Sequence, residues 1–252
     1  MIDYEAEYNN MTKVAEHPGI IAGWVLDAAT FRASHPHTEL DIAYGPSPRQ
    51  VLDLFWPGSG RDGPVALFIH GGYWQRLDKS FSSHLAKGLL AHGIAVAMPS
   101  YDLCPNVRVG DIVAQMRAAA ASLPGLVLAT GHSAGGHLAA MLLASGHVKA
   151  ALPLSGLFDL EPLVQTSMNN ALKLDAPEAT ALSPMTLPPP SGRLHAVVGG
   201  DEGAEYTRQS RGIAAAWGGT WESLPGLNHF TIVAELADPN SATIRAARRL
   251  VA

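Results

Sequence analysis

The hydrophobic and polar positions of this chain alternate between short apolar runs and longer segments with helical spacing. The apolar runs are rich in Val, Ile and Leu, which is typical of buried strands. We expect about eight strands, at Asp41–Tyr44, Val51–Trp56, Val65–Ile69, Ile94–Met98, Leu126–Ala129, Val148–Leu154, Leu194–Val198 and Thr220–Leu224. Because helical segments lie between most of these runs, the sequence predicts an α/β fold with a mostly parallel central sheet flanked by helices.

The helical segments are long enough to connect parallel strands. They are Phe81–His92, Arg108–Ser122, Gly135–Ser145, Glu205–Trp217, Phe230–Leu236 and Ser241–Val251. The first two strands are not joined by a helix. The turn residues Gly45–Pro48 connect them directly and predict an antiparallel hairpin. The segment from Tyr4 to Pro36 is expected to form two helical pieces, broken at Pro18–Gly19, on the outside of the sheet.

Residues 155–193 depart from this alternation. Pro162, Pro177, Pro184 and the run 188–190 interrupt any long helix there. A connection of this length in a compact domain generally covers a site or carries function. We therefore interpret residues 155–193 as a cap inserted into a single domain that spans residues 1–252; a plain surface excursion is the alternative.

Composition limits the classes of function. Of the 252 residues, 47% are hydrophobic and 15% are charged, so a large core is available and disorder is not expected. The single Cys104 forms no internal disulfide, the first residues lack a signal peptide, and no apolar run approaches the ~20 residues that span a bilayer. We expect a cytoplasmic protein without a membrane partner. The net charge of −5 argues against nucleic acid and favours a small-molecule substrate, while a homodimer stays open.

One short motif indicates the chemistry. Gly131-His132-Ser133-Ala134-Gly135 lies between the predicted strand Leu126–Ala129 and the predicted helix that follows. Small residues on both sides of a serine permit a sharp strand-to-helix turn that exposes the hydroxyl. The sequence therefore predicts that Ser133 is a nucleophile rather than part of an ordinary Gly/Ser turn.

A serine nucleophile needs a base and a carboxylate that orients the base. On this kind of scaffold the chain order is serine, acid, histidine, with the histidine after the last strand. His229 follows the last predicted strand and is the candidate base. Asp201 and Glu202 both follow the strand Leu194–Val198. We favour Glu202, from its distance to the glycine that ends the strand, and keep Asp201 as the alternative acid.

The developing oxyanion needs backbone N–H donors. Ala134, directly after the nucleophile, supplies one donor. The loop His70-Gly71-Gly72-Tyr73-Trp74, after an earlier predicted strand, is expected to supply the second from Gly72 or Tyr73. Tyr73 and Trp74 lie beside this loop and are expected to form aromatic walls for a substrate, with core packing as the alternative for Trp74.

Together these motifs resemble the kynurenine formamidase branch of the α/β-hydrolase superfamily. The likeness rests on His70–Trp74, Gly131–Leu138, Glu205–Ser210 and Asn228–Phe230, with the Tyr-Trp pair after the glycines as the discriminating element. The resemblance implies an α/β-hydrolase fold and hydrolysis of N-formyl-L-kynurenine to formate and kynurenine. Members often carry Asp at the position of Glu202, so the glutamate is a departure that keeps Asp201 open.

The expected mechanism uses Ser133, His229 and the acid through an acyl-enzyme, so we expect neither a metal ion nor an organic cofactor. A carboxylesterase for short acyl esters is the alternative enzyme. A hydrolase-fold protein that binds without catalysis is the alternative of another class. It is disfavoured because both the candidate nucleophile and the candidate base are present.

Overall fold

The protein is built around one eight-stranded sheet. The computed structural model describes residues 2–58 and 60–252. The strands are β1 (Thr38–Ala43), β2 (Val51–Phe55), β3 (Val65–Ile69), β4 (Ala95–Pro99), β5 (Leu126–His132), β6 (Ala150–Leu154), β7 (Arg193–Gly199) and β8 (Thr220–Leu224). Their order in the sheet is β1-β2-β4-β3-β5-β6-β7-β8. β2 pairs antiparallel with β1 and β4, and all other pairs are parallel. The expected fold class is thus confirmed.

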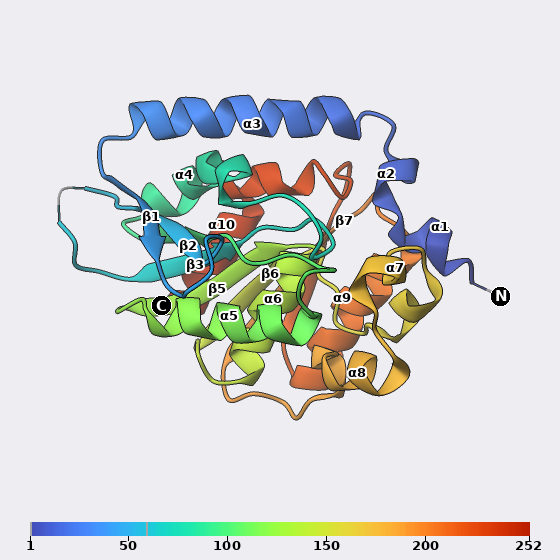
Figure 1. Cartoon of the computed structure of the whole chain (residues 1–252). Helices are drawn as coiled ribbons and strands as arrows, with labels where there is room; N and C mark the ends of the chain where they lie inside the picture. Colours follow the sequence, from blue (N-terminus) through green and yellow to red (C-terminus); the bar gives the residue numbers. More distant parts are fainter. Residues whose placement is uncertain (1, 59) are drawn as a thin grey trace.

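The central strands are apolar on both faces because helices cover both. All residues of β3, β4 and β6 are buried, as expected for parallel strands between two helical layers. The helices are α1 (Tyr4–Tyr8), α2 (Asn10–Lys13), α3 (His17–Ser34), α4 (Lys87–Leu90), α5 (Val109–Ala121), α6 (Ala134–Ala144), α7 (Asn169–Leu172), α8 (Ala176–Ala181), α9 (Ala204–Trp217) and α10 (Ala242–Val251). Helices α5, α6 and α9 lie on one side of the sheet, and α4 and α10 lie on the other (Figure 1).

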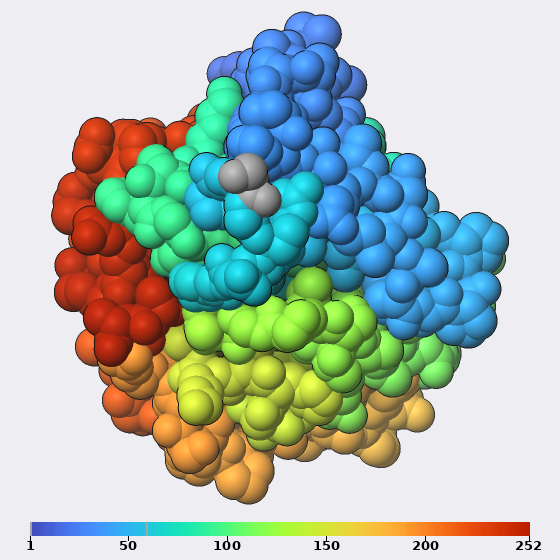
Figure 2. All heavy atoms as spheres, turned by 90° about the vertical axis from the view of Figure 1, so that its left-hand side faces the viewer, coloured from blue at the N-terminus to red at the C-terminus, as the bar shows by residue number. Residues whose placement is uncertain are grey.

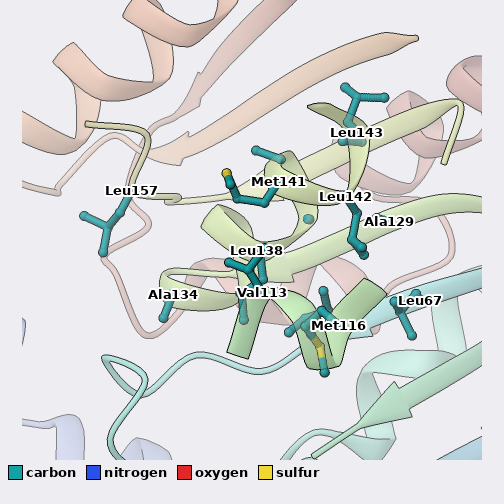
Figure 3. Close-up of a cluster of buried hydrophobic side chains, with 14 of the residues drawn as sticks. Leu67, Val113, Met116, Ala129, Ala134, Leu138, Met141, Leu142, Leu143 and Leu157 are labelled. Carbon is teal, nitrogen blue, oxygen red and sulfur yellow. The ribbon is translucent and has the colours of Figure 1, made fainter. Parts of the chain in front are cut away.

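Each side of the sheet has its own hydrophobic core. Figure 3 shows Leu67 of β3 near Met116 of α5, with Leu138 of α6 in the same cluster. Helix α6 has ten of its eleven residues buried, so it is an internal helix that fixes the end of β5 in the core. Seen from the β1 side in Figure 2, the N-terminal quarter in blue covers the top and right, and the C-terminal residues in red lie at the left.

The N-terminal segment differs from the expectation. The break falls before His17, and Pro18 lies in the first turn of α3, where a missing backbone N–H costs no helical hydrogen bond. The expected break at Pro18–Gly19 was therefore wrong. Of the 18 residues of α3 only Ala28 and Phe31 are buried. Helix α3 crosses above α4 as an outer layer, and α1 and α2 descend toward the carboxyl ends of the strands (Figure 1).

Two predicted helices are shorter in the structure. The segment Phe81–His92 is divided into the 3₁₀ turns η1 (Lys79–Phe81) and η2 (Ser83–Ala86) and the helix α4, and Phe230–Leu236 is reduced to the 3₁₀ helix η5 (Ile232–Leu236). Residues 155–193 contain η3 (Glu161–Gln165), α7, α8 and η4 (Pro184–Thr186). Among residues 2–58 and 60–252, no helix is both long enough and apolar enough to cross a membrane.

Candidate active site

Ser133 occupies a strained turn between β5 and α6. Its backbone has φ 55° and ψ −117°, a conformation that L residues rarely adopt. The turn is possible because its neighbours are small: a methyl group on Gly135 would lie 1.9 Å from the carbonyl oxygen of Ile69. The backbone N–H of Ser133 donates to the carbonyl of Leu154 at 2.9 Å, which anchors the turn to β6. The structure thus holds Ser133 in the geometry that displays a nucleophile.

His229 and Glu202 form a buried pair beside this turn. The loop after β8 carries His229, and the loop after β7 carries Glu202. Nδ1 of His229 lies 2.7 Å from Oε2 of Glu202, and the two side chains are 5% and 0% exposed. The other carboxylate oxygen, Oε1, accepts from Ser155 Oγ at 2.5 Å and from the N–H of Gly199 at 2.7 Å. Three donors therefore hold the carboxylate in one orientation toward the imidazole.

Asp201 has a different environment from Glu202. It is exposed, in the turn that follows β7, and its backbone N–H donates to the carbonyl of Leu227 at 3.1 Å. Adjacent residues of a turn project in different directions, and here the turn directs Glu202 inward. The structure thus brings Glu202, and not Asp201, into contact with His229.

The candidate oxyanion loop packs directly against the serine turn. A methyl group on Gly71 would lie 2.8 Å from the carbonyl oxygen of His132 and 3.3 Å from Cβ of Ser133. Gly72 and Tyr73 have φ values of 104° and 55°, so the loop turns its backbone through the left-handed region. In the described part of the chain, the N–H groups of Gly72, Tyr73 and Ala134 donate to no acceptor, which leaves them available to an oxyanion.

A single small cavity joins these elements. Its volume is about 50 Å³. It is lined by Met11, Ile21, Trp24, Gly72, Tyr73, Arg76, Leu77, His132, Ser133, His229 and Phe230. Ser133 and His229 thus share one wall, and Tyr73 also lines the cavity. Trp74 does not line it: it is 0% exposed, in the core, with its ring 5.2 Å from that of His137. The expected substrate contact of Trp74 therefore gives way to the core-packing alternative.

The N-terminal helices complete this cavity, which the sequence patterns did not indicate. Met11 comes from α2, and Ile21 and Trp24 come from α3. The hydroxyl of Tyr73 donates to the carbonyl of Tyr8 at 3.1 Å and accepts from the N–H of Asn10 at 3.1 Å. These bonds hold the first helices on the candidate oxyanion loop. No periodic signal reveals such contacts, because they join residues more than 60 positions apart.

A second histidine supports the candidate base. Nε2 of His132 lies 2.7 Å from the carbonyl oxygen of His229, so this nitrogen carries a proton and donates it. Burial lowers the pKa of His132 well below its ordinary value of 6.5, and the neighbouring His229 lowers it further. His132 is therefore neutral and fixes the backbone of His229. The ring of Tyr206 lies 4.7 Å from that of His229, and the ring of His132 lies 4.6 Å from it. The imidazole of His229 thus contacts both rings.

Comparison with known proteins shows that this chain is similar to hydrolases. Residues 66–251 match the model of the alpha/beta hydrolase family. A kynurenine formamidase of Danio rerio is 32% identical over 85% of this chain and 83% of its own length. One of Salmo salar is 31% identical over 80% and 78%. A crystal structure from Silicibacter sp. TM1040, named "putative thioesterase", has a TM-score of 0.91 and 34% identity, and the match covers 100% of this chain and 99% of that one. Esterase B of Lactobacillus rhamnosis shares the fold, with a TM-score of 0.69, 19% identity and coverage of 93% and 92%.

Proposed function

Because this chain belongs to the alpha/beta hydrolase family, we propose that it is a serine hydrolase that removes the formyl group from aryl formamides such as N-formyl-L-kynurenine. One observation carries the chemistry: the buried bond between His229 Nδ1 and Glu202 Oε2, next to Ser133 on the wall of one cavity. The substrate class is supported by the kynurenine formamidases among the relatives, which match most of the chain.

In the first step Ser133 Oγ attacks the formyl carbon. Nε2 of His229 takes the hydroxyl proton, while Glu202 holds Nδ1 protonated and stabilises the imidazolium. The carbonyl oxygen becomes an oxyanion that accepts from the N–H of Ala134 and from Gly72 or Tyr73; each such donor lowers a barrier by about 3 to 4 kcal/mol. The C–N bond then breaks, and His229 gives its proton to the leaving arylamine. The enzyme retains the formyl group as an ester on Ser133.

In the second step water hydrolyses this ester. His229 takes a proton from the water, whose oxygen attacks the formyl carbon, and the same donors hold the second oxyanion. The bond to Ser133 Oγ breaks, the serine recovers its proton from His229, and formate leaves. Every proton is moved by His229, so the sequence of steps is complete with residues of this chain and water.

The cavity volume favours a small acyl group. A buried water needs about 10–15 Å³ of such volume, so a cavity of about 50 Å³ accepts roughly four atoms of that size. A formyl group, with two heavy atoms, fits this space. The rings of Trp24 and Phe230 lie 6.2 Å apart at the same cavity and offer aromatic surfaces to an aryl leaving group.

Cleavage of short acyl esters is the second candidate function. The same nucleophile attacks an ester more easily than an amide, and an acetyl group is only one carbon larger than a formyl group. The cavity volume therefore supports this candidate as well.

The test compares N-formyl-L-kynurenine with p-nitrophenyl acetate, for the wild type and for Ser133→Ala. We expect a kcat/KM for the formamide well above that for the ester, and loss of both activities in the variant. Ester turnover alone, also lost in the variant, would replace the proposal by the esterase candidate. A Ser133→Ala enzyme that kept most of its activity would refute the serine mechanism. Labelling by an organophosphonate is the control, because only a functional Ser133 forms the adduct.

A further inference from the structure

Arg76 is a cationic side chain on the wall of the candidate active-site cavity. The other side chains on this wall are apolar or aromatic, apart from Ser133, His132 and His229. His132 is neutral because burial lowers its pKa well below 6.5, and His229 is bonded to Glu202. The guanidinium of Arg76 therefore gives this cavity its permanent positive charge. No carboxylate lines the cavity to balance it.

The guanidinium has no strong acceptor within the described residues. Its Nη1 lies 3.1 Å from Sδ of Met11, a weak acceptor, and no carboxylate lies within 4.0 Å of it. Arg49, in the turn between β1 and β2, contrasts with it. Arg49 donates to the carbonyls of Tyr101 and Leu77 at 2.7 Å each. An arginine that only holds the loop in place has such partners, and Arg76 lacks them.

The backbone places Arg76 beside the reacting groups. The N–H of Arg76 donates to the carbonyl of Gly72 at 3.1 Å, which closes the turn of the candidate oxyanion loop. Cγ of Arg76 lies 3.0 Å from the position that a methyl group on Gly72 would take. The aliphatic stem thus packs on Gly72, and the charged end lies beside Met11, another residue of the cavity wall. A substrate whose carbonyl lies at Gly72 and Ser133 would have its remote end within reach of this guanidinium.

We propose that Arg76 is a specificity-determining residue that binds a carboxylate on the substrate, at the end remote from the bond that is cleaved. The proposal rests on the proposed function and narrows its substrate class to aryl formamides that carry a carboxylate. A planar guanidinium binds a carboxylate through two parallel hydrogen bonds. Arg76 touches no atom of the scissile bond, so it contributes to binding and not to the chemical step.

The test measures kcat and KM for Arg76→Gln on two substrates that differ by one group. N-formyl-L-kynurenine carries the carboxylate, and N-formylkynuramine is the same molecule without it. We expect Arg76→Gln to lower kcat/KM for the first by about tenfold, mainly through KM, because a hydrogen bond to a charged group is lost at an exposed side chain. For the second we expect a change of about twofold at most. Arg76→Lys should lie between the wild type and Arg76→Gln. Arg211→Gln, which removes an exposed positive charge on α9, is the matched control and should change neither value.

Equal losses on both substrates, or no loss on either, would overturn the role of Arg76. A wild type that cleaves neither formamide would instead refute the proposed formamidase function. In that case the same comparison uses two esters, 4-acetoxybenzoate and phenyl acetate. A loss confined to 4-acetoxybenzoate in Arg76→Gln would support carboxylate binding by Arg76, and equal effects on the two esters would overturn it.

Discussion

Replacing Glu202 by Gln tests the candidate acid at nearly constant volume. In the structure its two oxygens accept three hydrogen bonds: Oε2 from His229 Nδ1, and Oε1 from Ser155 Oγ and the N–H of Gly199. A glutamine side chain has one oxygen that accepts and one nitrogen that donates. The amide nitrogen of the substituted glutamine must therefore face at least one of the groups that donated a hydrogen bond to Glu202.

The arrangement of these partners determines the outcome. Keeping the amide oxygen on Ser155 and Gly199 preserves two bonds and turns the amide nitrogen toward His229. His229 then accepts at Nδ1 and carries its proton on Nε2, the atom that has to receive the proton of Ser133. The corresponding Asp→Asn change in a serine protease lowers kcat by about 10⁴. We expect a similar loss here, which is about 5 kcal/mol in the activation barrier.

The assay is kcat for p-nitrophenyl acetate and for N-formyl-L-kynurenine, with Asp201→Asn as the matched control. The control should keep activity within about twofold, because Asp201 is exposed and the structure gives it no contact with His229. Urea unfolding of both variants separates a loss of catalysis from a loss of folding. If Glu202→Gln stayed within about tenfold of the wild type, or if Asp201→Asn were the inactive variant, the reasoning would be refuted.

Three further predictions concern stability, each measured by urea unfolding. Tyr8→Phe removes a buried hydroxyl that bonds Glu205 Oε2 at 2.7 Å, and should lower the free energy of unfolding by about 1–3 kcal/mol; no change would mean that this bond is not formed in solution. Gly135→Ala places a methyl group 1.9 Å from a backbone oxygen and should prevent stable folding, whereas Gly110→Ala, with nothing within 4 Å, should stabilise α5 by up to about 1 kcal/mol. Burial lowers the pKa of His137 from 6.5 to about 4. Between these pH values the unfolded chain binds a proton that the folded chain does not, so the free energy of unfolding should fall as pH decreases from about 7 to about 4. His137→Gln should reduce that dependence on pH.

The strands were predictable because burial on both faces leaves a direct record in the sequence. The run Val65–Ile69 forms the fully buried β3 with the expected bounds. The edge strand β8 also has the expected bounds, Thr220–Leu224, although none of its residues is buried. The serine turn was predictable for a similar local reason. A strand that turns this sharply into a helix requires glycines, and Gly131 and Gly135 supply them here. His229 followed from chain order alone, because the loop after the last strand of a parallel sheet ends at the same edge as the other loops.

Side-chain directions within loops were harder to predict. Asp201 and Glu202 are adjacent carboxylates in one turn, and only the backbone path after β7 decides which of them turns inward. The direction of Trp74 depends on the positive φ values of Tyr73 and Trp74, 55° and 57°. Non-glycine residues rarely adopt them, so no sequence pattern reveals them.

The N-terminal contacts were beyond any local signal. Tyr8 and Asn10 bond to Glu205 and Tyr206, nearly 200 positions later in the chain. Sequence periodicity reports which face of an element is apolar and says nothing about which distant residue it meets. The position of the helix break before His17 had a local signal that we interpreted incorrectly, since proline favours the first turn of a helix as well as its interruption.

The bonds of Tyr8 and Asn10 to Glu205 and Tyr206 also constrain the order in which parts of the protein fold during its synthesis. The first helices leave the ribosome early, yet their partners Glu205 and Tyr206 are made almost 200 residues later. Contacts this distant along the chain form slowly, because a long loop must close before they contribute. The bonds of the Tyr8 hydroxyl and the Asn10 amide to Glu205 and Tyr206 therefore form only after most of the chain has been made, although Tyr73 can hold the same helices earlier. The attachment of the first helices to α9 is consequently a late event of folding.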